Sequence, residues 1–321
     1  MAQVKISDIL KKKKTLSFEV FPPKEADGVP KLQKELDQLF KLSADFISCT
    51  YGAMGTNVGE SKAICKYIVD HDINCVTHFT VVGKKKEELK DIFSYYVNEL
   101  KLVNALTMRG DFQKDPATGD VKTSTGGDFE HANQLIEYFH KEFPKVGLAC
   151  AGYPEKHLLA PSIEDDIKWL KAKQDAGAEV VMCQTCHDVD AYEKWVAKCR
   201  KAGIKIPFVI GIMPILNRRN AIDMTIPGCI PVELSNLVGK YSPPPPPPKS
   251  APQADQDQWA AVSKKYDAEL EKYGMEYTIK EVERYLKTDL QGVHFYALNK
   301  AEKVAKIVHD GDLINLVAKS K

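Results

Sequence analysis

The chain alternates short β-rich runs with helix-length amphipathic segments, and this alternation constrains its fold more than any other feature. Strands are predicted at 16–21, 45–50, 74–80, 103–109, 146–151, 179–184, 207–212 and 292–297. Helices are predicted near 29–42, 59–70, 86–100, 128–142, 162–176, 188–202, 256–287 and 299–309. Eight strands, each followed by helical sequence in a chain of 321 residues, favour an α/β fold of the (β/α)8 TIM-barrel type.

An open doubly wound sheet is the alternative arrangement. It would normally carry a glycine-rich phosphate turn after the first strand. The first strand here ends in Phe21-Pro22-Pro23-Lys24, and neither a GxGxxG nor a Walker A pattern occurs in the chain. The barrel is therefore the preferred prediction.

A proline-rich segment at 241–256 interrupts the pattern before the last strand. Six consecutive prolines, Pro243 to Pro248, favour polyproline II, which cannot pack into a barrel. We interpret the segment as an exposed connection within a single catalytic domain that spans 1–321. A passive spacer is the preferred role, and a binding site for a proline-recognising partner is the alternative.

The composition is that of a globular protein, with 44% hydrophobic residues and a net charge of +1. This charge gives no sign of bulk nucleic-acid binding. No apolar run approaches the ~20 residues that span a bilayer, and the first residues lack the apolar region of a signal peptide. The eight scattered cysteines are interpreted as reduced thiols. We expect a cytoplasmic protein with neither membrane nor nucleic-acid partners.

Glu19 lies inside the first predicted strand, where a carboxylate is unusual unless it is paired or used. Alternation places it on one face with Ser17 and Phe21. An acid held in apolar surroundings has a raised proton affinity, which suits a general acid. An ordinary surface glutamate on an edge strand is the alternative interpretation.

Polar or glycine-bearing clusters follow nearly every predicted strand. In a β/α barrel the chemistry takes place at these carboxyl ends, so the pattern predicts a ring-shaped site. Each feature also has an ordinary explanation: His78 could be a hydrogen-bonded core histidine, and Arg109 with Asp111 could form a structural ion pair. The clusters include Thr50-Tyr51-Gly52-Ala53, His78, Arg109-Gly110-Asp111, Gly152-Tyr153, Gln184, Asn217 and Tyr296.

The run Cys183-Gln184-Thr185-Cys186-His187 matches a haem-attachment pattern. That chemistry belongs to exported proteins, and no export signal is present. A zinc site would need two further ligands at a credible spacing, which the sequence does not offer. We therefore expect no metal, and a redox-active dithiol is only weakly supported.

Taken together, these motifs resemble the methylenetetrahydrofolate reductase family, in its short form that consists of the catalytic barrel. The resemblance covers about 16–303. It is specific because seven motifs occur in order at matching spacing. They are Phe18-Glu19-Val20-Phe21-Pro22-Pro23-Lys24, Thr50-Tyr51-Gly52-Ala53, Met108-Arg109-Gly110-Asp111, Ala151-Gly152-Tyr153-Pro154-Glu155-Lys156-His157, Asp175-Ala176-Gly177-Ala178 with Gln184, Gly211-Ile212-Met213-Pro214 and His294-Phe295-Tyr296-Ala297-Leu298-Asn299.

The resemblance implies an FAD-dependent oxidoreductase of one-carbon metabolism and methionine biosynthesis. NADH or NADPH would donate hydride to the flavin and leave. The substrate 5,10-methylenetetrahydrofolate would then take its place and be reduced to 5-methyltetrahydrofolate, in a ping-pong reaction. A homo-oligomer is expected. A flavin-binding subunit that needs a partner protein for its electrons is the alternative.

The resemblance also implies roles for single residues. Glu19 matches the general acid, Asp111 the carboxylate beside the flavin's pyrimidine ring, and Gln184 a residue that contacts folate and nicotinamide. The positions expected to bind cofactor are Thr50, Tyr51, Ala53, His78, Arg109, Gly110, Asp111, Ala132, Tyr153, His157, Ala160, Asp166 and Lys173.

Several positions depart from the family's pattern. On the substrate side, Asn220 and Lys300 occupy positions where the family has a glutamine and an arginine, and both remain substrate-binding candidates. A lysine retains the charge but loses the bidentate fork of an arginine. Trp169 and Ala172 replace an asparagine and an arginine at the adenosine end of the dinucleotide, so FAD should be held differently there.

Overall fold

Eight parallel strands close into a barrel in the computed structural model, which describes residues 2–50, 58–112, 118–222 and 229–320. Each strand pairs with its neighbours in chain order, and β8 pairs with β1. The predicted (β/α)8 barrel is therefore confirmed. The strands are β1 (Thr15–Val20), β2 (Phe46–Cys49), β3 (Cys75–Thr80), β4 (Asn104–Met108), β5 (Gly147–Gly152), β6 (Val180–Cys183), β7 (Phe208–Ile212) and β8 (Gly292–Tyr296).

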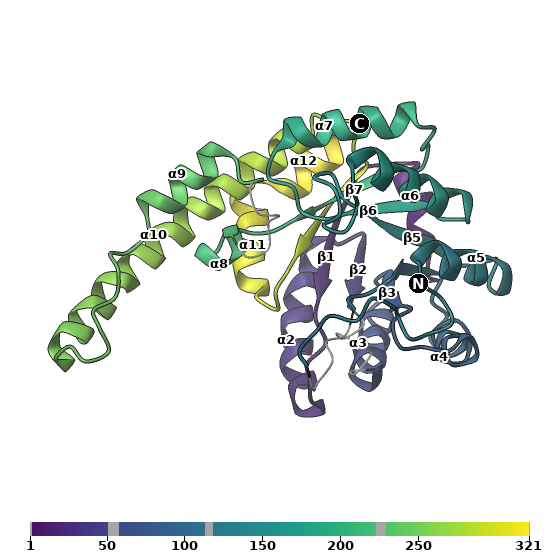
Figure 1. The fold of residues 1–321 in the computed structure, drawn as a ribbon, viewed down its shortest axis with the longest axis horizontal. Coiled ribbons are helices and arrows are strands. Elements are labelled where there is room, and N and C mark those ends of the chain that lie inside the picture. Colours follow the sequence, from purple (N-terminus) through teal and green to yellow (C-terminus); the bar gives the residue numbers. More distant parts are fainter. Residues whose placement is uncertain (1, 51–57, 113–117, 223–228, 321) are drawn as a thin grey trace.

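Helices surround the barrel (Figure 1). One helix follows each of β1 to β6 along the chain: α2 (Val29–Leu39), α3 (Val58–Asp70), α4 (Lys86–Asn98), α5 (Ala132–Glu142), α6 (Ile163–Asp175) and α7 (Val189–Lys201). Three lie between β7 and β8: α8 (Arg218–Ile222), α9 (Val232–Lys240) and α10 (Gln253–Tyr285). The chain ends with α11 (Ala301–Asp310) and α12 (Leu313–Lys319). Short 3-10 turns, η1 (Ala26–Gly28) and η2 (Phe40–Leu42), flank α2.

Apolar side chains fill the amino-terminal half of the barrel interior. One buried cluster joins inward-facing residues of β2 to β7 to the short helix α1 (Ile6–Leu10). Its strand members are Phe46, Val76, Leu106, Ala149, Val180, Met182 and Val209. The backbone N–H of Ile6 donates to Oδ1 of Asn104 over 2.8 Å, which holds α1 across this end. The helix therefore closes the amino-terminal mouth of the barrel.

A larger core lies between the outer face of the strands and the helices. The rings of Phe93 and Phe139 stack with centroids 4.2 Å apart, and Phe79 meets both of them edge to face. Burying each such side chain contributes about 1.5–3 kcal/mol, and each ring pair adds about 0.5–1.5 kcal/mol. This packing holds the strand ends, and hence the side chains that follow them, in fixed positions.

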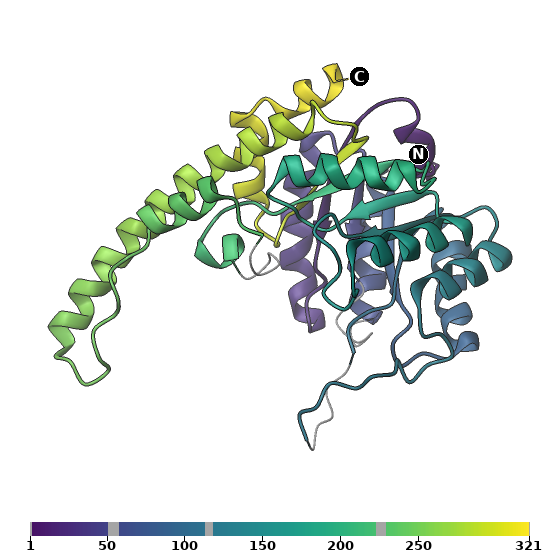
Figure 2. The same cartoon turned by 45° about the horizontal axis from the view of Figure 1, so that its top comes forward.

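The segment before β8 forms an arm that projects from the barrel, as Figures 1 and 2 show. Helix α10 begins at Gln253, so 253–256, which we predicted as part of the connection, are helical. The proline run lies against this helix, because Nε1 of Trp259 donates to the carbonyl of Pro244 over 2.8 Å. The rings of Tyr241 and Tyr273 stack with centroids 4.9 Å apart. The connection is thus tied to α10 along its length.

Within the residues described, no helix combines the length and apolar character that crossing a bilayer requires.

Candidate active site

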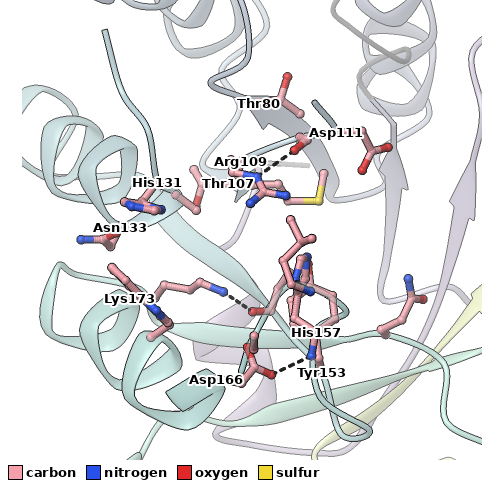
Figure 3. A pocket seen from close by; sticks show the side chains of 18 of the residues that line it. Thr80, Thr107, Arg109, Asp111, His131, Asn133, Tyr153, His157, Asp166 and Lys173 are labelled. Carbon is pink, nitrogen blue, oxygen red and sulfur yellow. Dashed lines mark hydrogen bonds between the residues drawn. The ribbon is translucent and has the colours of Figure 1, made fainter. Parts of the chain in front are cut away.

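A cavity of about 450 Å³ lies at the carboxyl ends of β3 to β6 (Figure 3). Its size falls within the range of ordinary small-molecule sites. Residues at the strand ends form its floor, and the start of α5, the loop before α6 and one face of α6 form its outer wall. The polar and glycine residues that line it are Thr80, Thr107, Arg109, Gly110, Asp111, His131, Asn133, Tyr153, His157, Asp166, Lys173 and Gln184.

Gly110 is required by the backbone at the end of β4. Its φ is +86°, a conformation that residues with a side chain rarely adopt. A Cβ atom there would come within 2.9 Å of Cβ of Thr80. Both the backbone conformation and the packing against Thr80 therefore require glycine at this position in the cavity wall.

Two cationic side chains, Arg109 and Lys173, line the same cavity. The Nζ atom of Lys173 donates to the carbonyl of Ala151 over 2.9 Å, and Arg109 stacks on Phe112 at 4.2 Å. Oδ2 of Asp166 accepts from the backbone N–H of His157 over 3.1 Å. These contacts hold Arg109 and Lys173 in the cavity wall, where their cationic groups can pair with an anionic group of a ligand.

Burial tunes the other titratable groups of the cavity. It raises the pKa of Tyr153 to about 12, and it also raises the pKa of Asp166. Burial and the nearby Arg109 lower the pKa of His157. Tyr153 and His157 are therefore neutral near pH 7, so the positive charge in the cavity comes from Arg109 and Lys173.

Most of the predicted cofactor-binding residues lie together in this cavity. Those that line it are Arg109, Gly110, Asp111, Ala132, Tyr153, His157, Ala160, Asp166 and Lys173. Tyr51 and Ala53 lie outside the described residues. Thr50 and His78 are described but do not line this cavity. His78 lies beside Glu19, and Thr50 lies beside Ser61.

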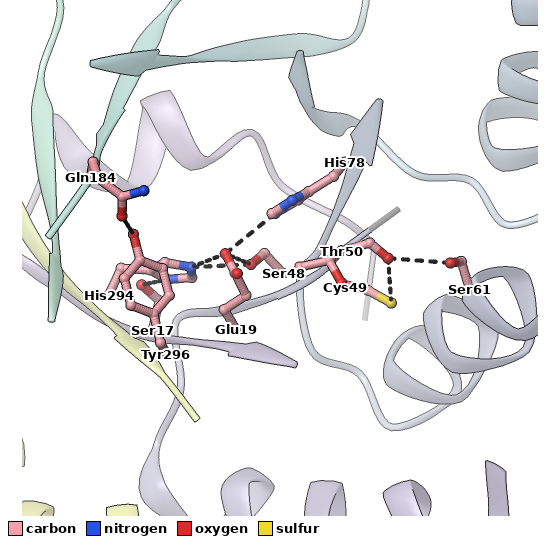
Figure 4. A network of polar contacts seen from close by, with 10 residues as sticks. All are labelled: Ser17, Glu19, Ser48, Cys49, Thr50, Ser61, His78, Gln184, His294 and Tyr296. Atoms are coloured by element: carbon pink, nitrogen blue, oxygen red, sulfur yellow. Dashed lines mark hydrogen bonds and ion pairs between the residues drawn. The ribbon is translucent and has the colours of Figure 1, made fainter. Parts of the chain in front are cut away.

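Glu19 points into the barrel interior and meets polar side chains from three other strands (Figure 4). Its Oε2 atom lies 3.6 Å from Nε2 of His78 and 3.5 Å from Nε2 of His294, with one imidazole on either side of it. Oγ of Ser48 donates to the same oxygen over 3.4 Å. Oγ of Ser17 lies 2.8 Å from Nδ1 of His294. Glu19 is thus a buried carboxylate within a hydrogen-bonded network.

The expectation that Glu19 has a raised proton affinity is wrong for the free protein. Burial does raise its pKa, but the charge of His78 and the hydrogen bonds from His294 and Ser48 lower it by more. The net result is a pKa below the ordinary value of 4.5. The prediction considered apolar surroundings, whereas the interior around Glu19 is lined by imidazole and hydroxyl groups.

Gln184 connects the network to the cavity. It lines the cavity, and its Oε1 accepts a hydrogen bond from the hydroxyl of Tyr296 over 2.8 Å. Tyr296 is the register partner of Glu19 in the β1–β8 pair, and Ser48 is its partner in the β1–β2 pair. The cavity and the Glu19 network therefore share one end of the barrel.

The remaining substrate-side candidates are not brought into this cavity. Lys300 lines a second space of about 640 Å³ beside α2 and α11, together with Lys31 and Glu35. Asn220 is buried on α8, and its Oδ1 atom has no hydrogen-bond partner among the described residues. The backbone carbonyl of Thr50 accepts from Oγ of Ser61 over 3.2 Å.

His294 is the main residue of this network to which the sequence assigned no role. A signal was present, since strand alternation places His294 on the same face as Tyr296, two residues later. Ser17 and Ser48 carry no comparable signal, because a buried serine in a strand is common. Within the described ranges, no group of three or more His, Cys, Asp or Glu side chains is arranged to hold a metal ion.

A flavin dinucleotide fits the residues of the cavity. Gly110 lines the cavity without a side chain, and Arg109 and Lys173 supply charge for a diphosphate. The cavity also carries aromatic surface at Tyr153 and Trp169. The residues present are thus compatible with a phosphate-bearing aromatic cofactor.

The fold and the site define a β/α barrel with a candidate active site at the carboxyl ends of its strands. The profile of the methylenetetrahydrofolate reductase family matches residues 5–243, and the chain belongs to this family.

Individual relatives agree with this assignment. Methylenetetrahydrofolate reductase 1 of Schizosaccharomyces pombe is 31% identical over 313 residues, which are 95% of this chain and 48% of that protein. The chain thus spans about half the length of the first curated relatives it matches. The 5,10-methylenetetrahydrofolate reductase of Salmonella typhimurium is 27% identical, over 92% of this chain and 89% of that protein.

A solved structure shares the fold. It is an uncharacterized protein from Clostridium thermocellum described as binding two copies of 5-methyl-5,6,7,8-tetrahydrofolic acid. Its TM-score is 0.59 at 14% identity, over 98% of this chain and all of that one.

Proposed function

We propose that the chain reduces 5,10-methylenetetrahydrofolate to 5-methyltetrahydrofolate, with FAD as cofactor and NADH or NADPH as hydride donor. The observation that carries this proposal is the position of Gln184. It lines the cavity suited to the cofactor, and through Tyr296 it adjoins the strand that carries Glu19. One side chain thus lies between a cofactor-sized space and a buried acid.

Arg109 and Lys173 would hold the diphosphate, and the backbone at Gly110 would lie against the cofactor. The chemistry supplied by FAD is hydride acceptance from the nucleotide and hydride donation to the folate in a separate half-reaction. Asp111, exposed at the edge of the cavity, would place a negative charge beside the flavin and oppose its anionic reduced form. The contribution of the chain is thus orientation, charge and proton delivery.

Glu19 would deliver the proton to the folate nitrogen that leaves the methylene carbon. Its lowered pKa means that it is ionised in the free protein near pH 7. Proton delivery therefore requires the substrate complex to raise this pKa, and a folate ring covering the site would remove water and act in that direction. His78 and His294, both within 3.6 Å, are the neighbouring groups that can exchange a proton with it.

The first test is whether the purified protein contains bound flavin. The protein should be yellow, and denaturation should release a flavin absorbance. Anaerobic stopped-flow with NADH and then NADPH should show flavin reduction, and addition of the folate should reoxidise the flavin. Colourless protein that takes up no added FAD would refute the proposal.

A second candidate function is a flavin-binding subunit that takes its electrons from a partner protein. It is favoured by the positions of Asn220 and Lys300, which leave the substrate side of the cavity without these candidates. It predicts FAD binding without oxidation of NADH or NADPH. Robust nucleotide–menadione activity from the chain alone would reject it.

A further inference from the structure

Trp169 is an exposed tryptophan at the mouth of the cavity. Its exposed fraction is 46%, whereas Trp195 is buried in the core at 3%. A tryptophan is a large apolar side chain, and leaving almost half of it in water forgoes stabilisation that burial would give. Part of this exposed surface lines the cavity.

The position of Trp169 on α6 links it to the charged groups of the site. Asp166, Trp169 and Lys173 are spaced three and four residues apart, so they share one face of the helix, and all three line the cavity. Asp166 is buried, whereas Trp169 and Leu159, which also lines the cavity, are exposed. Trp169 therefore lies between a carboxylate and a cation on this face, with part of its indole in water.

His131 supports the indole from the start of α5. The two ring centroids are 4.7 Å apart and the ring planes are inclined by 34°. Both residues line the cavity, so the pair forms an aromatic wall on its outer side. A wall of this kind presents the surface on which a purine ring stacks.

We propose that Trp169 is the stacking platform for the adenine ring of FAD, and that stacking here replaces recognition by polar side chains. The inference rests on the proposed function, because it concerns the same cofactor. In this arrangement the flavin would lie at the strand ends, the diphosphate beside Arg109 and Lys173, and the adenine against Trp169 in the outer wall of the same cavity. FAD is therefore bound through its adenine end as well as its flavin end.

The proposal predicts different effects on the binding of FAD and of FMN, because FMN has no adenine. Flavin is removed from the purified protein, and the apoprotein is titrated with FAD and with FMN while the quenching of flavin fluorescence is followed. Trp169→Ala should weaken FAD binding roughly tenfold, the effect of losing one base–aromatic stack. It should change FMN affinity by less than about twofold, whereas Trp169→Phe should retain most of the FAD affinity.

Leu158 provides the matched control. Its side chain is 69% exposed in the loop before α6, next to Leu159, and it does not line the cavity. Leu158→Ala should bind both flavins as the wild type does. Circular dichroism melting shows that each variant is folded, and the half-exposed Trp169 leaves little packing to lose.

The outcomes are distinct. Equal losses of FAD and FMN affinity in Trp169→Ala, or no loss of either, would overturn the adenine platform and leave the proposed function standing. A change of oligomeric state with unaltered FAD affinity would identify Trp169 as a protein contact and also overturn it. Wild-type protein that binds no flavin would refute the proposed function itself, and the platform with it.

Discussion

The Nδ1 atom of His187 lies 2.7 Å from Oε1 of Glu281, and both side chains are almost fully removed from solvent. His187 follows β6, three residues after Gln184, and Glu281 lies on α10. The hydroxyl of Tyr285, one turn further along α10, donates to the carbonyl of Cys186 over 2.5 Å. The long helix thus holds the loop that carries Gln184.

Glu281→Gln should destabilise the protein by about 2 kcal/mol, the scale of a hydrogen bond to a charged group. Burial alone lowers the pKa of His187, but the charge and hydrogen bond of Glu281 raise it above 6.5 overall. The folded state therefore holds this proton more tightly, and the stabilisation is present below pH 6.5 and lost as pH rises through the folded pKa. Melting temperatures from pH 5.5 to 9 should show the difference from wild type narrowing with pH.

Glu283→Gln, an exposed change on the same helix, is the matched control. A destabilisation by Glu281→Gln that stays constant or grows with pH would contradict a charged pair.

Glu19→Gln should abolish folate reduction and leave flavin reduction by NADH or NADPH intact. The amide keeps the shape of the side chain but has no proton to deliver, and general acid catalysis contributes about 10²–10⁴-fold in rate. Stopped-flow measurement of the two half-reactions separates these effects. Glu25→Gln, an exposed carboxylate just beyond β1, should leave both rates unchanged. Equal loss of both half-reactions with the fold intact would rule out the acid role.

Gly211→Ala should impair the substrate side of the site and spare flavin binding. The added Cβ would collide with the hydroxyl of Tyr296 and come within 2.7 Å of the carbonyl of Cys183. Tyr296 must then move away from Gln184, and such a misplacement costs on the order of tenfold to hundredfold in kcat/KM. Steady-state kinetics and FAD titration of the variant measure the two effects.

Gly239→Ala is the control, because a Cβ on α9 at this position meets no atom within 4 Å. A normal kcat/KM in Gly211→Ala would show that the Tyr296–Gln184 contact does not matter for activity.

Glu155 should make the protein less stable as pH rises. Burial raises its pKa to about 7, from an ordinary value of 4.5, so the folded state binds more protons than the unfolded chain between these values. Stability falls across that interval, and Glu155→Gln removes the titrating group. The melting temperature of Glu155→Gln should equal that of the wild type near pH 5 and exceed it at pH 8. Glu137→Gln, an exposed change on α5, should show no such trend, and a pH-independent effect of Glu155→Gln would exclude the raised pKa.

The fold could be predicted because its signals are local. Alternating apolar residues define the strands, and the predicted strand ranges overlap all of those observed. The cavity residues at the ends of β4 and β5 could be predicted because the residues after a barrel strand converge with those after its neighbours. The approximate ends of the helices follow from the same periodicity.

The pKa of Glu19 could not be predicted in the same way, since it depends on His294, which is 275 positions away in the sequence and lies on the neighbouring strand β8. The His187–Glu281 pair joins residues 94 apart in the sequence. The local pattern around His187, with its two cysteines, indicates only haem or metal binding and gives no sign of this pair. Asn220 and Lys300 were placed by alignment with motifs, but their positions depend on the paths of α8 and of the turn after β8. Each of these features arises from tertiary contacts.

The closure of the amino-terminal mouth by α1 has a further consequence for the order in which reactants can enter the barrel. Ile6 and Leu10 close the amino-terminal mouth and apolar side chains fill the barrel above them, so within the described part of the chain Glu19 is not approached from that end. Two reactants that need the same interior position must then use it in turn, the first departing before the second arrives. Under the proposed function, the closed amino-terminal end of the barrel would thus favour alternating occupancy at the carboxyl end.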